Sequence, residues 1–279
     1  MPEMETGRLR SPRFHFWHDQ PLVMGILNVT SDSFSDGGRF LDSARAIDQG
    51  LRMREEGADI VDVGGESTRP GAAPVPVGEE LARVIPVISA LAREGIAVSV
   101  DTMKPAVMRT AIEAGCVMVN DVNGFRAEGA IAAVAVRGIT ACVMHMQGNP
   151  GTMQANPQYG DVVAEVTAFL RERAAELQAS GVAAEDIVVD PGFGFGKTLA
   201  HNIALFRGLP QVAALGYPVL VGMSRKRTLG DLTGRAVDDR LAGSVAAAVL
   251  AVQNGASLVR VHDVKETVDA MKIWMAFKR

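Results

Sequence analysis

The stretch AVSVDTMKPAVMRTAIEAGCVMVND, residues 97–121, decides the fold. It contains two short apolar runs, 97–101 and 117–121, on either side of a helical pattern. Near-continuous apolar strands are typical of parallel sheets that are buried on both faces. Gly115 ends the helical pattern, at a position where a left-handed cap favours glycine. The stretch therefore predicts one strand–helix–strand unit of a parallel sheet.

The same unit recurs along the whole chain. Helical patterns separate the apolar runs; one spans 199–216, and the least regular covers 126–137. Eight alternations without a linker predict an α/β fold, a single (β/α)8 TIM barrel over residues 21–279 after an N-terminal extension, 1–20. A doubly wound open sheet is the main alternative. The expected strands are 22–28, 59–64, 97–101, 117–121, 140–145, 186–190, 218–223 and 258–262.

Bulk composition excludes several classes of protein. The 279 residues are 48% hydrophobic and carry a formal net charge of -4, which argues against a nucleic-acid partner. No apolar stretch reaches the roughly 18 residues of a membrane span, and the N-terminus lacks a signal-peptide core. Cys116 and Cys142 both lie in apolar runs and are expected to be reduced core residues. A cytoplasmic protein with no membrane partner is predicted.

Polar side chains mark the carboxyl ends of nearly all the expected strands. In a (β/α)8 barrel, these ends and the loops after them carry the functional groups. Helix capping does not explain such an accumulation at one rim. The residues are Asn28, Asp62, Glu66, Thr68, Arg69, Asp101, Asn120, Asp121, His145, Asp190, Ser224, Arg225, Lys226, Arg260, His262 and Asp263.

The first strand ends in GILNVTSDSFSDGG, residues 25–38. Asn28 supplies a neutral oxygen donor, and a Ser/Asp/Gly loop around the aromatic Phe34 follows it. Such an arrangement suits a hard cation and a loop that closes over a ligand. A solvated surface loop without a ligand is the alternative.

The glycine-rich segment DPGFGFGKT, residues 190–198, is not a nucleotide-binding loop. A Walker loop requires glycine five residues before the glycine of its Gly-Lys pair, and Pro191 stands there. We interpret the segment as a turn that holds Asp190 at a strand end and offers Phe195 for stacking on a flat ligand. A purely structural connection is the alternative. In VMHMQG, residues 143–148, Met144 or Met146 is expected to line the same planar slot.

Two groups of basic residues predict anion binding. Ser224 and Lys226 lie where a strand meets a helix, and helix-start amides beside cations bind anions. A Schiff-base role for Lys226 is the alternative. Arg260 and His262 are two residues apart on a strand, so they point to the same side and suit a pyrophosphate. Their alternative is a structural ion pair with Asp263.

Asp101, Asn120, Asp190 and Lys226 come from four different expected strand ends. Carboxylates and an amide accept from amino and ring N–H groups, whereas lysine donates to a carbonyl. Pterins have an edge with this mixture of groups. Guanine-like or sugar ligands also remain open from the residue types.

The motifs GILNVTSDSFSDGG, DVGGESTRPGA, VSVDT, VND, MHMQG, DPGFGFGK, SRK and RVHDV together resemble the dihydropteroate synthase family of the folate pathway. The resemblance runs from about residue 21 to the C-terminus. It implies a transferase that joins 6-hydroxymethyl-7,8-dihydropterin pyrophosphate to p-aminobenzoate, uses Mg²⁺ and forms a homodimer. Sulfonamides mimic p-aminobenzoate and would compete at its pocket.

The resemblance also implies roles for individual residues. Pterin contacts would be Asp101, Asn120, Asp190 and Lys226, beside Phe195 and Met144. Pyrophosphate and Mg²⁺ would lie among Asn28, Arg69, Arg260 and His262. The p-aminobenzoate would contact Ser224, Thr68, Phe34 and Pro70. Catalytic roles would fall to Asp101, Lys226, Arg260 and His262, with Phe34 and Asp36 in a covering loop. Ser31 replaces the proline that is usual in the family.

Two alternatives share the pterin slot. Folate-dependent methyltransferases that act on corrinoid proteins resemble the chain at Asp101, Asn120 and Asp190, but they have no use for a leaving-group anion site. A pterin-binding partner subunit without catalytic activity is the second alternative.

Overall fold

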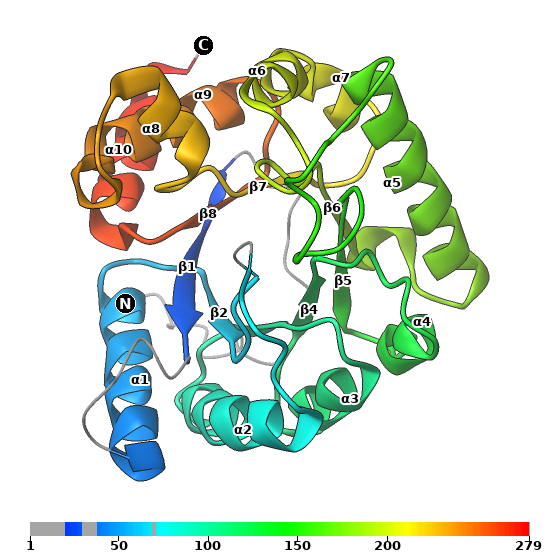
Figure 1. Ribbon diagram of the computed structural model, residues 1–279. Coiled ribbons are helices and arrows are strands. Elements are labelled where there is room, and N and C mark those ends of the chain that lie inside the picture. The colour runs from blue at the N-terminus through cyan, green and yellow to red at the C-terminus, as the bar shows by residue number, and fades with distance from the viewer. Residues whose placement is uncertain (1–19, 30–37, 69–70, 279) are drawn as a thin grey trace, which may run out of the picture.

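Eight parallel strands surround the centre of the molecule, and the helices form a ring outside them (Figure 1). This computed structural model describes residues 20–29, 38–68 and 71–278. The strands are β1 Leu22–Asn28, β2 Ile60–Gly64, β3 Val98–Asp101, β4 Met118–Asp121, β5 Thr140–Met144, β6 Ile187–Asp190, β7 Leu220–Val221 and β8 Leu258–Val261.

The sheet closes on itself almost completely. Its order is β6-β5-β4-β3-β2-β1-β8-β7, so β1 lies between β2 and β8. At the seam between β6 and β7, a single bridge joins Val189 of β6 to Val219, and the Val189 N–H donates to the Pro218 carbonyl at 2.9 Å. The predicted (β/α)8 barrel is therefore confirmed, and the open doubly wound sheet is wrong.

Helices follow the strands in chain order and cover the outside of the barrel (Figure 1). Where the sequence provides a cap, the helix uses it: the Asp161 carboxylate accepts from the Val163 and Ala164 N–H groups at the start of α5. The helices are α1 Gly38–Glu55, α2 Val77–Arg93, α3 Pro105–Glu113, α4 Ala130–Val134, α5 Val162–Ala179, α6 Leu199–Arg207, α7 Leu209–Ala213, α8 Arg227–Thr233, α9 Leu241–Gln253 and α10 Val264–Phe277.

Alternation along the strands divides the apolar residues into two layers. Outward-facing residues pack against the helices in the large core, as Val61 and Val63 of β2 do. The inward-facing residues fill the barrel as a separate cluster, which we call the plug. The plug consists of Met24, Ile60, Met118, Cys142, Val188, Leu220 and Leu258.

Three local expectations differ from the structure. The strand expected at 218–223 is only Leu220–Val221, at the seam. The helix expected over 199–216 is divided into α6 and α7 at Gly208, where a Cβ would lie 2.6 Å from a Val163 methyl group. Pro210, which lacks an N–H, lies in the first turn of α7 and cannot continue α6. Helix α8 was not expected as a separate element.

Both cysteines are free and buried, as predicted. Burial raises the pKa of Cys116 to about 12 and raises that of Cys142, so both thiols stay protonated. Within residues 20–29, 38–68 and 71–278, no helix has the length and apolarity needed to cross a lipid bilayer.

Leu91 tests how much the outer core stabilises the barrel. Its side chain is fully buried on α2 and lies against Gly50 of α1, where a Cβ would be 2.7 Å from a Leu91 methyl group. We expect Leu91→Ala to lower the free energy of unfolding by about 2–5 kcal/mol, because it leaves a cavity between the helices. Urea denaturation measures the change.

The matched control is Leu232→Ala, since Leu232 of α8 is 58% exposed. Its effect should stay within about 0.5 kcal/mol. Equal losses in the two variants would contradict this account of the core.

Candidate active site

A polar layer lies directly above the plug, at the carboxyl ends of the strands. On β2, β4, β6 and β8, each polar residue follows a plug residue by two positions and therefore points to the same side. Asp101 of β3 follows the buried Ser99 in the same way. The polar layer consists of Asp62, Asp101, Asn120, Asp190 and Arg260.

Arg260 connects three strands at this level. Its Nε donates to Asp62 Oδ2 at 2.6 Å, and its Nη2 donates to Asp101 Oδ2 at 2.8 Å. Asn120 Nδ2 donates to the same Asp62 oxygen at 3.2 Å. Asp62 is fully buried and Asp101 is nearly so. Buried carboxylates are stable only when paired, so the guanidinium holds β8 to β2 and β3.

The sequence-based alternative of an Arg260–Asp263 ion pair is wrong. Asp263 Oδ2 instead accepts from Arg225 Nε at 3.1 Å, and a second bond joins Asp263 Oδ1 to Arg225 Nη2. His262 is likewise separate from the Arg260 pairs: its Nδ1 lies 3.0 Å from Ser224 Oγ, and its backbone N–H donates to the same oxygen. Ser224 and His262 are therefore brought together, as neighbouring parts of the rim.

Three acceptor atoms of the polar layer are buried without a hydrogen-bond partner among the residues that the structure describes. They are Asp62 Oδ1, Asp101 Oδ1 and Asn120 Oδ1. Leaving such an atom unpaired costs about 1–3 kcal/mol, and native proteins satisfy nearly all of them. Three acceptors on adjacent strands fit a ligand that presents several N–H donors.

Asp190 and Lys226 come from opposite sides of the β6–β7 seam, and their charges attract each other. Asp190 Oδ1 accepts from the Gly192 N–H at 2.7 Å. Lys226 Nζ donates to the Phe193 carbonyl and lies 4.7 Å from the centroid of the Phe195 ring. The ammonium thus lies over an aromatic face, and the Asp190 carboxylate attracts it.

The pKa values of Asp101 and Lys226 lie near neutral pH. Burial raises the pKa of Asp101 to about 7, although Arg260 acts in the opposite direction. Burial also raises the pKa of Asp190, against the attraction of Lys226. Desolvation lowers the pKa of Lys226 to about 8, with Asp190 opposing the shift. Perturbed groups at one barrel mouth are typical of an active site.

The segment after β6 is held by a lysine to which the sequence analysis gave no role. Lys197 is buried, and its Nζ contacts His145 Nδ1 at 2.9 Å, the Gly192 carbonyl at 2.9 Å and the Phe195 carbonyl at 3.1 Å. Burial, with the charge of Lys197 nearby, lowers the pKa of His145 to about 3, so its ring is neutral. Lys197 therefore fixes the backbone that presents Phe195.

Phe195 and Met144 lie in one apolar cluster beside the polar layer. The cluster contains the buried residues Val122, Met144, Met146 and Met153, and Phe195 packs against it. That these side chains line a slot for a flat ligand stays a prediction. The cluster lies next to the polar layer, because Met144 pairs in register with Asp190.

Asp62 is the second residue without a predicted role, although it was recognised at a strand end. An acidic residue inside the apolar run DIVDVGG was the available signal. Lys197 carried a similar signal, since it directly follows GFGFG. The carboxylate that Arg260 binds and the histidine that Lys197 binds are distant in sequence, so these pairings required the fold.

Other predicted residues are placed less completely. Asn28 is exposed at the end of β1, and Thr68 is half-buried in the segment after β2. In the part of the chain that the structure describes, no group of three or more His, Cys, Asp and Glu side chains can hold a metal ion. Four predicted site residues lie outside the described residues, as does Ser31: they are Phe34, Asp36, Arg69 and Pro70.

Comparison with known proteins agrees with this geometry. The family described as "Pterin binding enzyme" matches residues 24–262, which span the strands from β1 to β8. The barrel and its polar mouth are thus those of a pterin-binding enzyme.

The relatives are more specific. Dihydropteroate synthase of Neisseria meningitidis serogroup B is 50% identical, over 95% of this chain and 95% of its own. The structure of Xanthomonas albilineans dihydropteroate synthase with 7,8-dihydropteroate is 51% identical, has a TM-score of 0.84 and covers 92% of this chain and 94% of that one. The structure of the same Xanthomonas albilineans enzyme with 4-aminobenzoic acid is 52% identical, has a TM-score of 0.87 and covers 95% of this chain and 98% of that one. The chain belongs to the dihydropteroate synthase family.

Gly192 tests how closely the segment after β6 must approach β5. Its φ is +69°, and a Cβ would lie 1.9 Å from the His145 carbonyl oxygen. We expect Gly192→Ala to displace the backbone next to Asp190 and to lower the melting temperature strongly, since a carbonyl on a strand end cannot move aside.

Gly216→Ala is the matched control, because Gly216 has a φ of +85° with nothing within 4 Å of its Cβ position. That variant should lose only about 1–2 kcal/mol of stability, which is the cost of placing a non-glycine residue in the left-handed region. Similar melting temperatures for both variants would show that the close approach is unimportant.

Proposed function

We propose that the chain joins 6-hydroxymethyl-7,8-dihydropterin pyrophosphate to p-aminobenzoate and releases pyrophosphate. The observation that carries the proposal is the set of three unpaired buried acceptors, on Asp62, Asp101 and Asn120, next to Asp190 and Lys226. The family supports the same reaction, because relatives at about 50% identity are dihydropteroate synthases.

The pterin ring would lie in the slot between Phe195 and Met144. Its amino and ring N–H groups would donate to Asp190, Asn120 and Asp101, and Lys226 would donate to its carbonyl oxygen. Each charge-assisted hydrogen bond contributes about 1.5–3 kcal/mol. The unpaired acceptors would then gain partners, which favours this ligand over one that lacks donors.

The reaction is a displacement at the exocyclic methylene carbon of the pterin. The carbon–oxygen bond to pyrophosphate breaks, the aniline nitrogen forms the new carbon–nitrogen bond, and that nitrogen loses a proton. Positive charge develops on the methylene carbon and the electron-rich ring. The Asp101 carboxylate, held by Arg260, would stabilise this charge. An aniline needs little activation, so the reaction needs no paired nucleophile and base.

Mg²⁺ fits the leaving-group side of the site. Mg²⁺ prefers oxygen ligands and usually combines one or two protein oxygens with phosphate oxygens and water. Asn28 offers such an oxygen, and Asp101 offers a second one nearby. Asn28 Oδ1 and Asp101 Oδ2 lie 3.8 Å and 3.9 Å from the position that a Cβ atom added to Gly64 would occupy. Asn28 would hold the ion next to the pyrophosphate, and the ion would neutralise the charge of the departing group.

The remaining assignments stay predictions. His262 and Arg69 would contact pyrophosphate, Ser224, Thr68 and Pro70 would contact p-aminobenzoate, and Phe34 and Asp36 would cover the site. A homodimer, a cytoplasmic location and competition by sulfonamides belong to the same proposal. The reduced state of both buried thiols is consistent with that location.

Synthesis of product tests the function directly. Purified protein with dihydropterin pyrophosphate, p-aminobenzoate and Mg²⁺ should form dihydropteroate, detected by mass spectrometry, and an equal amount of pyrophosphate. EDTA should abolish both, and added Mg²⁺ should restore them. Pterin binding without product would support the non-catalytic subunit instead, and the absence of pterin binding would overturn the proposal.

The pH dependence follows from two groups. Asp101 must be ionised and has a pKa of about 7, and Lys226 must be protonated and has a pKa of about 8. The value of kcat/KM for the pterin substrate should therefore fall as pH decreases below about 7 and as it increases above about 8.

Two variants assign the limbs of this profile. Asp101→Asn should lower kcat/KM by about 10² or more and remove the acid limb, since an amide does not titrate. Lys226→Arg should remove the alkaline limb, since a guanidinium stays charged. Ionisation of the substrate is the same in all three proteins. An acid limb that persists in Asp101→Asn would contradict the assigned role of Asp101.

A further inference from the structure

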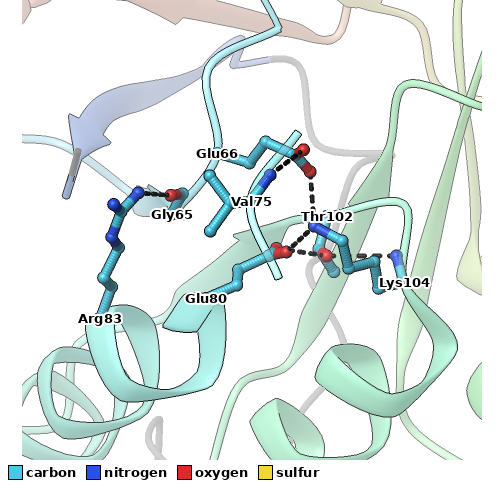
Figure 2. Close-up of polar contacts among 7 residues, drawn as sticks. All are labelled: Gly65, Glu66, Val75, Glu80, Arg83, Thr102 and Lys104. Atoms are coloured by element: carbon cyan, nitrogen blue, oxygen red, sulfur yellow. Dashed lines mark hydrogen bonds and ion pairs between the residues drawn. The ribbon is translucent and has the colours of Figure 1, made fainter. Parts of the chain in front are cut away.

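Lys104 connects two carboxylates beneath the segment that follows β2 (Figure 2). Its Nζ donates to Glu66 Oε2 at 2.6 Å and also to Glu80 Oε2. Glu80, in the first turn of α2, is fully buried, and Glu66 is nearly buried. Lys104 itself follows β3 by three residues, so the pairs join two successive β–α units, β2–α2 and β3–α3.

The Glu66 carboxylate anchors both ends of the segment that runs from Glu66 to Val75. Its Oε2 binds Lys104, whereas its Oε1 accepts from the Val75 N–H at 2.9 Å, nine residues later (Figure 2). Gly65, the preceding residue, is held through its carbonyl by Arg83 Nη1 at 2.8 Å. Hydrogen bonds and an ion pair therefore hold both ends of the segment in place. We call these anchored ends, with the residues next to them, the base. Thr68 lies two residues after Glu66, within this base.

The opposite side of the network reaches the pterin half of the site. Thr102 Oγ1 donates to Glu80 Oε1 at 2.6 Å, and the Lys104 N–H donates to Thr102 Oγ1 at 3.2 Å. Thr102 directly follows Asp101 at the end of β3. The same buried glutamate therefore contacts the residue after Asp101 and the lysine that holds Glu66.

Ion pairs stabilise this network. Burial alone would lower the pKa of Lys104, but its hydrogen bonds to Glu66 and Glu80 raise the pKa above the ordinary value, so the ammonium stays charged. One lysine serves two carboxylates, and removal of its charge takes the salt-bridge partner from the fully buried Glu80.

We propose that Lys104 is a positioning residue that fixes, through Glu66, where Thr68 meets p-aminobenzoate. The inference rests on the proposed function and deepens it: Lys104 contacts neither substrate, and it aligns the arylamine side with the pterin side held by Asp101. A misplacement of about 1 Å can cost on the order of 10²-fold in rate, so a firm base for Thr68 matters for turnover.

The test compares Lys104→Met and Glu66→Gln with the wild-type protein. Glu66→Gln removes the charge link to the segment after β2 and leaves Lys104 paired with Glu80, so the fold is not at risk. Should Lys104→Met not fold, Lys104→Met/Glu80→Gln removes both charges of this pair together. Lys272→Met is the matched control, because it removes a lysine from an exposed ion pair with Asp269.

Two readouts are needed. We expect KM for p-aminobenzoate to rise about tenfold in the Lys104 and Glu66 variants, with the Kd for dihydropterin pyrophosphate within about twofold of wild type. Hydrogen exchange at the Val75 amide should accelerate in the same variants, because its acceptor Glu66 is released. Lys272→Met should change neither value.

Each other outcome has a definite meaning. An unchanged KM for p-aminobenzoate, or equal losses for both substrates, overturns the positioning role. An inactive wild-type protein overturns the proposed function, and the Val75 exchange rate then decides alone whether Lys104 holds the segment. Fast Val75 exchange in wild-type protein would also overturn the inference.

Discussion

The pairing of one guanidinium with two buried carboxylates is the constraint on which this structure depends. Arg260 comes from the last strand, whereas Asp62 and Asp101 come from the second and third. None of the three could remain charged inside the barrel without the others. Their pairing fixes β8 against β2 and β3 and leaves one oxygen of each carboxylate without a partner among the described residues. The same two groups therefore stabilise the barrel and still offer an acceptor at its mouth.

Strand alternation places this cluster where it can act. The inward positions carry apolar residues at the level of the plug, and two residues later they carry acids, an amide and the arginine. The plug excludes water from below, which strengthens every electrostatic interaction above it. The raised pKa of Asp101 and the lowered pKa of Lys226 both result from this environment. One simple periodicity thus produces both a core and a reactive surface.

The sequence predicts the barrel well because apolar runs and helical patterns are local signals. It also predicts which residues gather at the rim, since Asp101, Asn120 and Asp190 lie at the carboxyl ends of strands and Lys226 follows β7. It does not predict partners that are distant in the chain: Asp62 with Arg260, Lys197 with His145 and Ser224 with His262 each depend on the closed sheet. The shortening of β7 depends on its position at the seam, and α6 ends at Gly208 because Val163 of another helix approaches it.

The seam between β6 and β7 has a mechanical consequence. Only one bridge joins these strands, so separation is less costly here than along the other ladders. Asp190 stands on one side of the seam and Lys226 follows the strand on the other. A ligand bound by both residues would link the two sides of the least strongly paired junction between neighbouring strands. Ligand binding would therefore make the barrel more rigid, and the ligand-free protein would open transiently along the β6–β7 seam.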